Sequence, residues 1–204
     1  MRVVHFIQVG YNIENIRKTC RCFDGRCEQN IPGREAAKSV ANQPSKSKVY
    51  FLCGPAGSGK STFAKRFESE GMTILSFDKE SFRRGLNVHP LPEETAKEVR
   101  IFLDDQLNRL IEQNVDVVLD YSFWSKEIRA EYIALLKKHG ITPVIYYIKT
   151  PKEIILDRIR NRKGSRPDDI MLPEQVASYY YDHFQPPTAD EGTIIIVEGC
   201  ESRE

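Results

Sequence analysis

Short apolar runs alternate with amphipathic stretches along the chain from residue 48 onward. Five runs of five to seven residues predict buried strands, at 48–53, 72–76, 115–120, 142–148 and 193–197. Between them, apolar residues recur every three or four positions, most clearly in residues 93–113, which predicts amphipathic helices. Strands separated by helices predict an α/β fold. We expect a mostly parallel five-stranded sheet with helices on both faces, which makes three layers (α/β/α).

Three residues mark helix ends in this pattern. Gly71 and Gly140 can adopt the left-handed conformation that ends a helix, and Pro151 stands where a helix can begin. The predicted helices cover residues 59–69, 79–86, 93–113, 126–139, 151–162 and 173–184. Residues 1–46 lack such periodicity. We therefore predict a poorly ordered N-terminal extension followed by one domain over residues 47–204.

The turn between the first predicted strand and helix is glycine-rich and reads Gly54-Pro-Ala-Gly-Ser-Gly-Lys-Ser61. Its spacing, in a strand–turn–helix context, is the P-loop pattern. Glycines let the backbone turn successive N–H groups into one anion-binding concavity. A turn that is glycine-rich only for packing is the alternative, and the complete motif argues against it. We predict that the loop binds ATP through Gly54, Pro55, Ala56, Gly57, Ser58, Gly59, Lys60, Ser61 and Thr62.

Two side chains of this loop and one strand ending have predicted chemical roles. Lys60 can reach the β- and γ-phosphates, which makes it a catalytic candidate, and the Ser61 hydroxyl can ligate Mg²⁺. Asp120 follows apolar residues of its strand and resembles a Walker B aspartate that holds Mg²⁺ close to the substrate. The alternative for Asp120 is a turn residue that closes the strand. ATP and Mg²⁺ are thus the expected cofactors.

Asp78 follows the second predicted strand and is a candidate general base for an acceptor hydroxyl. Spacing alone leaves open that Asp78 caps the next helix, because aspartate is a favoured N-cap. Arg83 and Arg84 follow within two helical turns. We expect one of them to face an anionic substrate and the other to be solvated.

A run of cations follows the fourth predicted strand. Arg158 is a candidate ATP ligand, and Arg162 is a candidate catalytic residue near the end of its helix. Arg160 and Arg162 cannot share one helix face at a spacing of two residues. The run, continued by Arg166, suggests a lid that closes over ATP, and the alternative is an exposed helix face.

Aromatic residues follow Asp120 directly. Tyr121, Phe123 and Trp124 could stack on a flat ring in an acceptor pocket. Hydrophobic packing at a strand-to-helix junction is the reading we favour.

Composition narrows the class of protein. Residues 1–48 hold nine Lys/Arg and four Asp/Glu, whereas the remaining residues hold 21 Lys/Arg and 25 Asp/Glu. Nucleic acid is a possible partner, but the net negative charge of the domain does not indicate one.

Five cysteines, of which Cys20, Cys22 and Cys27 cluster, predict a reduced, cytoplasmic protein and not a disulfide framework. No apolar run is long enough to span a membrane.

The residues from about 49 to 197 resemble the P-loop proteins of the AAA-domain ATP-binding family that are often called predicted kinases. The resemblance rests on the P-loop, on Ser76-Phe-Asp78, on Val117-Val-Leu-Asp120 with Arg129, and on Asp157–Arg162. In organisation the domain is similar to the kinase domain of phage polynucleotide kinase, chloramphenicol phosphotransferase and zeta-toxin-type kinases. The resemblance implies that Asp78 activates the acceptor and that Arg162 or Arg160 is the lid arginine.

Taken together, these features predict a kinase that transfers the γ-phosphate of ATP to a hydroxyl of a small molecule or of a nucleic-acid 5′ end. The alternative is a nucleotide-binding module that hydrolyses ATP slowly and acts as a switch. The acceptor itself is left open.

Overall fold

The computed structural model describes residues 46–86, 90–167 and 169–199. The predicted N-terminal extension lies outside the described residues except for Lys46, and so do Cys20, Cys22 and Cys27. Those predictions therefore stay predictions.

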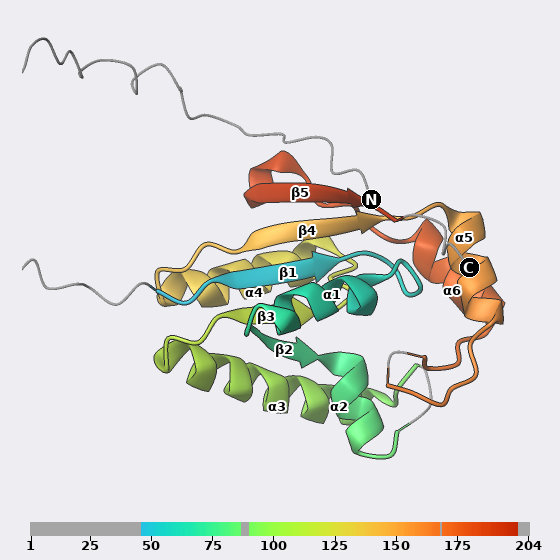
Figure 1. Ribbon diagram of the computed structural model, residues 1–204, viewed down its shortest axis with the longest axis horizontal. Coiled ribbons are helices and arrows are strands. Elements are labelled where there is room, and N and C mark those ends of the chain that lie inside the picture. Colours follow the sequence, from blue (N-terminus) through green and yellow to red (C-terminus); the bar gives the residue numbers. More distant parts are fainter. Residues whose placement is uncertain (1–45, 87–89, 168, 200–204) are drawn as a thin grey trace, which may run out of the picture.

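Five parallel strands form the centre of the described chain (Figure 1). They are β1 (Val49–Cys53), β2 (Thr73–Ser76), β3 (Val117–Asp120), β4 (Val144–Lys149) and β5 (Thr193–Glu198). Their order across the sheet is β2-β3-β1-β4-β5, with β1 paired to both β3 and β4. The predicted sheet is confirmed, and every strand pair in it is parallel.

Helices connect these strands close to the predicted positions. They are α1 (Lys60–Ser69), α2 (Phe77–Arg83), α3 (Glu93–Glu112), α4 (Lys126–Lys138), α5 (Lys152–Arg160) and α6 (Glu174–Asp182), with a 3₁₀ turn η1 (Ala189–Glu191). The largest difference is α2, which begins directly at the end of β2 and not at residue 79. Ser76 causes this early start, because its hydroxyl accepts a hydrogen bond from the Lys79 backbone N–H and caps the helix.

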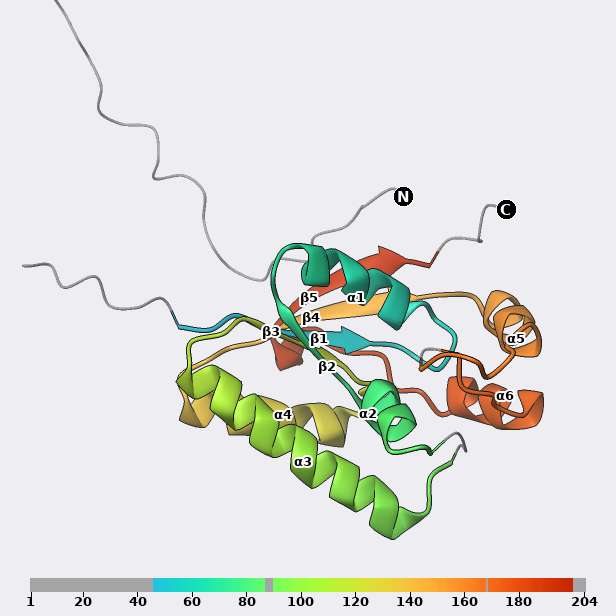
Figure 2. The ribbon, with the colours of Figure 1, turned by 60° about the horizontal axis from the view of Figure 1, so that its bottom comes forward.

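Side-chain alternation along β1 builds the layers. Phe51 and Cys53 join a core with α3 and α4 on one face, and Leu52 packs with Ala64 and Phe67 of α1 on the other. Figure 2 shows α1 on one side of the sheet and α3 and α4 on the opposite side. Burying one such large apolar side chain stabilises the fold by roughly 1.5–3 kcal/mol. The three-layer α/β/α prediction is therefore confirmed.

A smaller apolar cluster lies beyond the carboxyl ends of the strands. Helices α5 and α6 pack together there through Ile155, Ile159 and Ala177, with Leu172 just before α6, and Ala56 of the loop after β1 packs against this cluster. The pair of helices is thus attached to the glycine-rich loop by direct packing.

Candidate functional site

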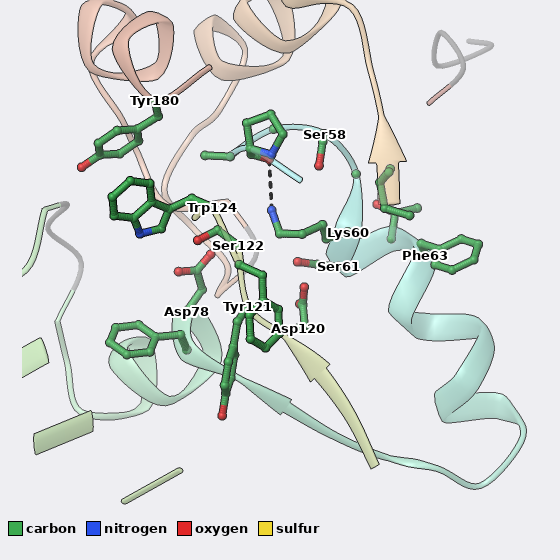
Figure 3. Close-up of a pocket in the computed structure, with 18 of the residues that line it drawn as sticks. Ser58, Lys60, Ser61, Phe63, Asp78, Asp120, Tyr121, Ser122, Trp124 and Tyr180 are labelled. Carbon is green, nitrogen blue, oxygen red and sulfur yellow. Dashed lines mark hydrogen bonds between the residues drawn. The ribbon is translucent and has the colours of Figure 1, made fainter. Parts of the chain in front are cut away.

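A cavity of about 1280 Å³ opens at the carboxyl ends of the strands. Its walls come from the loop after β1, the starts of α1, α2, α3 and α4, the loop after β3, the α5–α6 region and the end of β5. Polar strand endings of a parallel sheet meet at this edge. Figure 3 shows Lys60, Ser61, Asp78 and Asp120 around this cavity, although they lie up to 60 positions apart in the sequence.

The loop after β1 needs glycine because it is packed tightly against its neighbours. Gly57 has φ +84°, and a Cβ there would lie 3.2–3.3 Å from atoms of Ile155 and Ile159. A Cβ at Gly54 would lie 2.7 Å from the Ser58 hydroxyl oxygen. Any larger residue at these positions would push the loop away from α5 or distort its own turn.

Two side chains from outside the loop bind its carbonyl groups. Thr150 Oγ1 donates to the Ser58 carbonyl at 2.9 Å, and Arg158 Nη1 donates to the Gly57 and Ser58 carbonyls at 3.3 and 3.2 Å. In a trans peptide the carbonyl and the following N–H point in opposite directions. Bonds that hold these carbonyls on one side therefore turn the next N–H groups of the loop to the other side.

Lys60 lies along this loop with its ammonium group inside the turn. Its Nζ donates to the Gly54 carbonyl at 2.9 Å and to the Pro55 carbonyl at 3.0 Å. Burial lowers the pKa of Lys60, and the negative charges of Asp120 and Asp78 oppose that shift. The lysine is therefore a partly buried cation with two carboxylates in electrostatic range.

Asp120 is buried at the end of β3, and its Oδ1 atom has no hydrogen-bond partner among the described residues. Burial raises the pKa of Asp120, although Lys60 and a hydrogen bond from Ser61 work against that shift. Magnesium prefers hard oxygen ligands and takes several of them from phosphates and water. An unpaired carboxylate oxygen beside a hydroxyl fits this ion, so Asp120 and Ser61 are the residues that would hold it.

Asp78 lines the same cavity from the first turn of α2. Because Ser76 is the N-cap of α2, the alternative reading of Asp78 as the cap is wrong. The carboxylate is left available to the cavity, where Figure 3 shows it on the side of Trp124 and Ser122.

Arg83 and Arg84 do not line the cavity, contrary to the expectation that one of them would face it. Arg83 makes two hydrogen bonds of 2.8 Å to Glu80, and Arg84 Nε binds the same carboxylate at 2.7 Å. Both guanidinium groups also lie over the Phe102 ring. Glu80, one turn before the arginines, captures both of them, which helix phase alone did not reveal.

The cationic run after β4 divides as its spacing suggested. Arg158, Arg162 and Arg166 line the cavity, whereas Arg160 is exposed and binds Glu174 at 3.1 Å. Arg162 follows the end of α5, and its Nη1 donates to the Ile170 carbonyl at 2.9 Å. Arg162, and not Arg160, is therefore the arginine placed at the site, and its catalytic role stays a prediction.

A family model described as an AAA domain matches residues 49–187. The chain belongs to this AAA-domain family. None of the curated proteins matches the sequence.

Solved structures share the fold of this AAA domain at low sequence identity. A candidate kinase from Chloroflexus aurantiacus superposes with a TM-score of 0.62 and 14% identity, covering 76% of this chain and 89% of that one. A sugar kinase from Janibacter sp. superposes with a TM-score of 0.53 and 19% identity, covering 74% of this chain and 85% of that one. A chain of the Pnkp1/Rnl/Hen1 RNA repair complex gives 0.60 and 15%, covering 71% of this chain and 46% of that one.

The loop after β3 of the AAA domain carries the aromatic residues. Tyr121 and Phe123 are buried and pack against the core, as predicted. Trp124 is 48% exposed and lines the cavity, so the packing interpretation is wrong for this residue.

Three residues that the sequence did not single out hold this AAA-domain site together. Thr150 holds the loop after β1, as described above. Glu191 binds the buried Arg129 at 2.5 Å, 62 positions away. Gly199 leaves room for Thr150, because a Cβ there would lie 1.7 Å from Thr150 Oγ1. Sequence spacing cannot predict contacts between residues this far apart in the chain. The position of Thr150 directly after a strand was the one sequence feature that could have indicated a role at the site.

No helix within the described ranges is long and apolar enough to cross a membrane. Location in the cytoplasm stays a prediction.

Proposed function

We propose that this AAA-domain protein is an ATP-dependent kinase that transfers the γ-phosphate to a hydroxyl group of an acceptor. The observation that carries the proposal is the position of Asp78. Its carboxylate shares one cavity with the glycine-rich loop, Lys60 and Ser61. A kinase needs a proton acceptor beside its phosphate cradle, whereas slow hydrolysis as a switch does not require one there.

The chemistry follows from the placement of these groups. Asp78 accepts the proton of the acceptor hydroxyl while that oxygen forms a bond to the γ-phosphorus. The bond from the γ-phosphorus to the bridging oxygen of ADP breaks, and ADP carries away that electron pair. Lys60 stabilises the charge on the phosphates, and Arg162 adds positive charge from the segment after α5. Mg²⁺ bound by Ser61 and Asp120 would supply further charge neutralisation and alignment of the phosphates.

The fold supports this proposal in a general way. The superposed structures include a candidate kinase and a sugar kinase. At 14–19% identity they indicate a shared scaffold, and the acceptor has to be inferred from the cavity itself.

A transfer assay with γ-labelled ATP and Mg²⁺ tests the proposal. The acceptor panel contains nucleosides, oligonucleotides with free 5′-hydroxyls, sugars and antibiotics. We expect label on one acceptor class, and a loss of at least about 100-fold in both Lys60→Ala and Asp78→Asn. Asp78→Asn should still bind ATP, since Asp78 contacts the acceptor and not the phosphate loop.

Arg83→Gln serves as the matched control on α2, because Arg83 lies outside the cavity, and it should keep full transfer. Release of free phosphate alone, lost in Lys60→Ala but retained in Asp78→Asn, would contradict the kinase and favour the ATPase or switch reading.

A further inference from the structure

Exposed aromatic surface is concentrated in the cavity. Among the described residues, four large hydrophobic side chains are exposed: Ile101, Trp124, Met171 and Tyr179. The two aromatic members of this group, Trp124 and Tyr179, both line the cavity. Large apolar side chains left in contact with water at a concave site are typical of ligand binding.

The backbone holds Trp124 firmly although its indole is half exposed. The Trp124 carbonyl accepts a hydrogen bond of 2.9 Å from the Gln185 N–H, which links the loop after β3 to the segment after α6. Phe123 before it is buried with φ +45°, and Arg129 Nη1 binds its carbonyl at 2.8 Å. Ser125 after it is the N-cap of α4. The backbone that carries the Trp124 indole is therefore held in place on both sides.

Further aromatic residues surround this surface on the side of Asp78. Phe77 of α2 and Tyr180 of α6 line the same cavity. In Figure 3, Trp124, Tyr180 and Asp78 lie on one side of the cavity, and Phe63 of α1 lies on the other. The aromatic wall therefore belongs to the part of the cavity that holds the proposed base.

The arginines that α2 and α3 carry near this wall are bound to carboxylates. Arg100 of α3 lines the cavity, but its guanidinium binds Glu131 at 2.5 Å and lies 3.8 Å from Asp104. Arg83 and Arg84 are bound to Glu80 outside the cavity. On this side α2 and α3 thus supply Asp78 and aromatic faces, and the arginines Arg158, Arg162 and Arg166 reach the cavity from the α5–α6 region.

We propose that the acceptor carries a flat heteroaromatic ring of the nucleoside type, which stacks on the Trp124 indole and places its hydroxyl at Asp78. This inference rests on the proposed kinase function and specifies its substrate class. The same chemistry is offered by a free nucleoside and by the terminal nucleotide of a strand. Stacking on an aromatic side chain tolerates any base, because every base has a flat π-face.

Trp124 is the sole tryptophan of the chain and reports on its own contacts. The protein is first saturated with ADP and Mg²⁺ so that the nucleotide site is filled, and uridine, thymidine or ribose is then titrated. We expect saturable quenching of tryptophan fluorescence by the nucleosides and none by ribose. Equal responses to ribose and nucleosides, or no response to either, would overturn the inference.

Substitutions at position 124 test the stacking face itself. Trp124→Leu keeps an apolar side chain but removes the ring, so kcat/KM for the nucleoside should fall about 10- to 100-fold while KM for ATP stays unchanged. Trp124→Phe restores a ring and should recover most of the loss. Ile101→Ala, an exposed apolar residue outside the cavity, is the control and should behave like wild type. Equal losses in the Leu and Phe variants would contradict stacking.

The two readouts separate this inference from the kinase proposal. Efficient phosphate transfer to sugars, unaffected by Trp124→Leu, would overturn the ring-bearing acceptor and leave the kinase intact. Nucleoside quenching without any transfer would contradict the kinase and leave the binding site intact. A short 5′-hydroxyl oligonucleotide that is preferred over the nucleoside, with affinity that falls as salt rises, would identify a strand end as the source of the ring.

Discussion

Gly57 and Gly71 have nearly the same positive φ, +84° and +86°, in very different surroundings. A Cβ at Gly57 would press against Ile155 and Ile159, whereas a Cβ at Gly71 would meet nothing within 4 Å. Alanine substitutions at these two positions therefore distinguish two effects: the free-energy cost of a side chain at positive φ, and the loss of ATP binding when the phosphate loop is displaced.

We expect Gly57→Ala to weaken ATP binding at least about 10-fold, since the loop must move away from α5. Gly71→Ala should lower the free energy of unfolding by about 1 kcal/mol and leave ATP affinity unchanged. Calorimetric titration with ATP and urea denaturation of both variants give the two quantities. Equal ATP affinities in the two variants would contradict the role of close packing at Gly57.

The limits of prediction are visible among individual residues. Lys60, Ser61, Asp78 and Asp120 reach one cavity as the sequence indicated, because the ends of parallel strands share an edge. The positions of Arg83 and Arg84 were not predictable in the same way. The two arginines bind the Glu80 carboxylate on their own helix in place of a ligand. Sequence spacing does not show which of these two partners an arginine will bind.

At the scale of the elements, the buried pair of Arg129 and Glu191 connects α4 to η1. Their side chains are 0% and 5% exposed, and Arg129 also donates to the Phe123 and Gln185 carbonyls at 2.8 and 2.7 Å. Removal of one partner would leave a buried charge without its counterion. We therefore expect Glu191→Ala to lower the free energy of unfolding by about 3–5 kcal/mol in urea denaturation.

Asp190→Ala is the matched control for this pair. Asp190 neighbours Glu191 and binds Lys126, but both members of its ion pair are more than half exposed. Its replacement should change the stability little. Similar destabilisation by the two substitutions would contradict a special role for the buried pair.

The same pair predicts a dependence of stability on pH. Burial raises the pKa of Glu191, but hydrogen bonds from Arg129 and Thr188 outweigh it, and the folded pKa lies below the usual glutamate value. The pair therefore stabilises the protein above the unfolded pKa, about 4.3, and this contribution is lost as the pH falls through the lower folded value. Thermal unfolding from pH 7 to pH 3 should show a shallower acid loss in Glu191→Gln than in wild type.

Identical acid profiles for Glu191→Gln and wild type would rule out this origin of the pH dependence.

Element boundaries were predictable where the apolar pattern is strong. The bounds of β1, β3, β4 and β5 lie within two residues of the predicted ranges, because buried runs between polar ends leave little choice of register. The start of α2 was missed, since Ser76 serves both as the last residue of β2 and as the helix cap.

At the scale of the whole molecule, the cavity joins the sheet to the α5–α6 pair. Arg158 binds the loop after β1, Arg162 lines the cavity, and Ala56 packs into the α5–α6 cluster. A ligand at the loop would therefore act on both parts at once.

Hydrogen exchange can measure this coupling. On addition of ATP and Mg²⁺ we expect slower amide exchange in α1 and in α5 (Lys152–Arg160), and little change in residues 105–112 of α3, which do not line the cavity. Lys60→Ala should abolish the effect. Unchanged exchange in α5 would count against the predicted lid over ATP.

The position of Trp124 between two anchored neighbours also bears on how such a protein could diversify. Phe123 is fixed by burial and Ser125 by its capping bond, so the neighbours hold the backbone at position 124 while about half of its side chain meets solvent. Substitutions at position 124 can therefore change which acceptor is bound without compensating changes elsewhere in the fold. Randomisation of this single codon is therefore the shortest route to variants that accept different molecules.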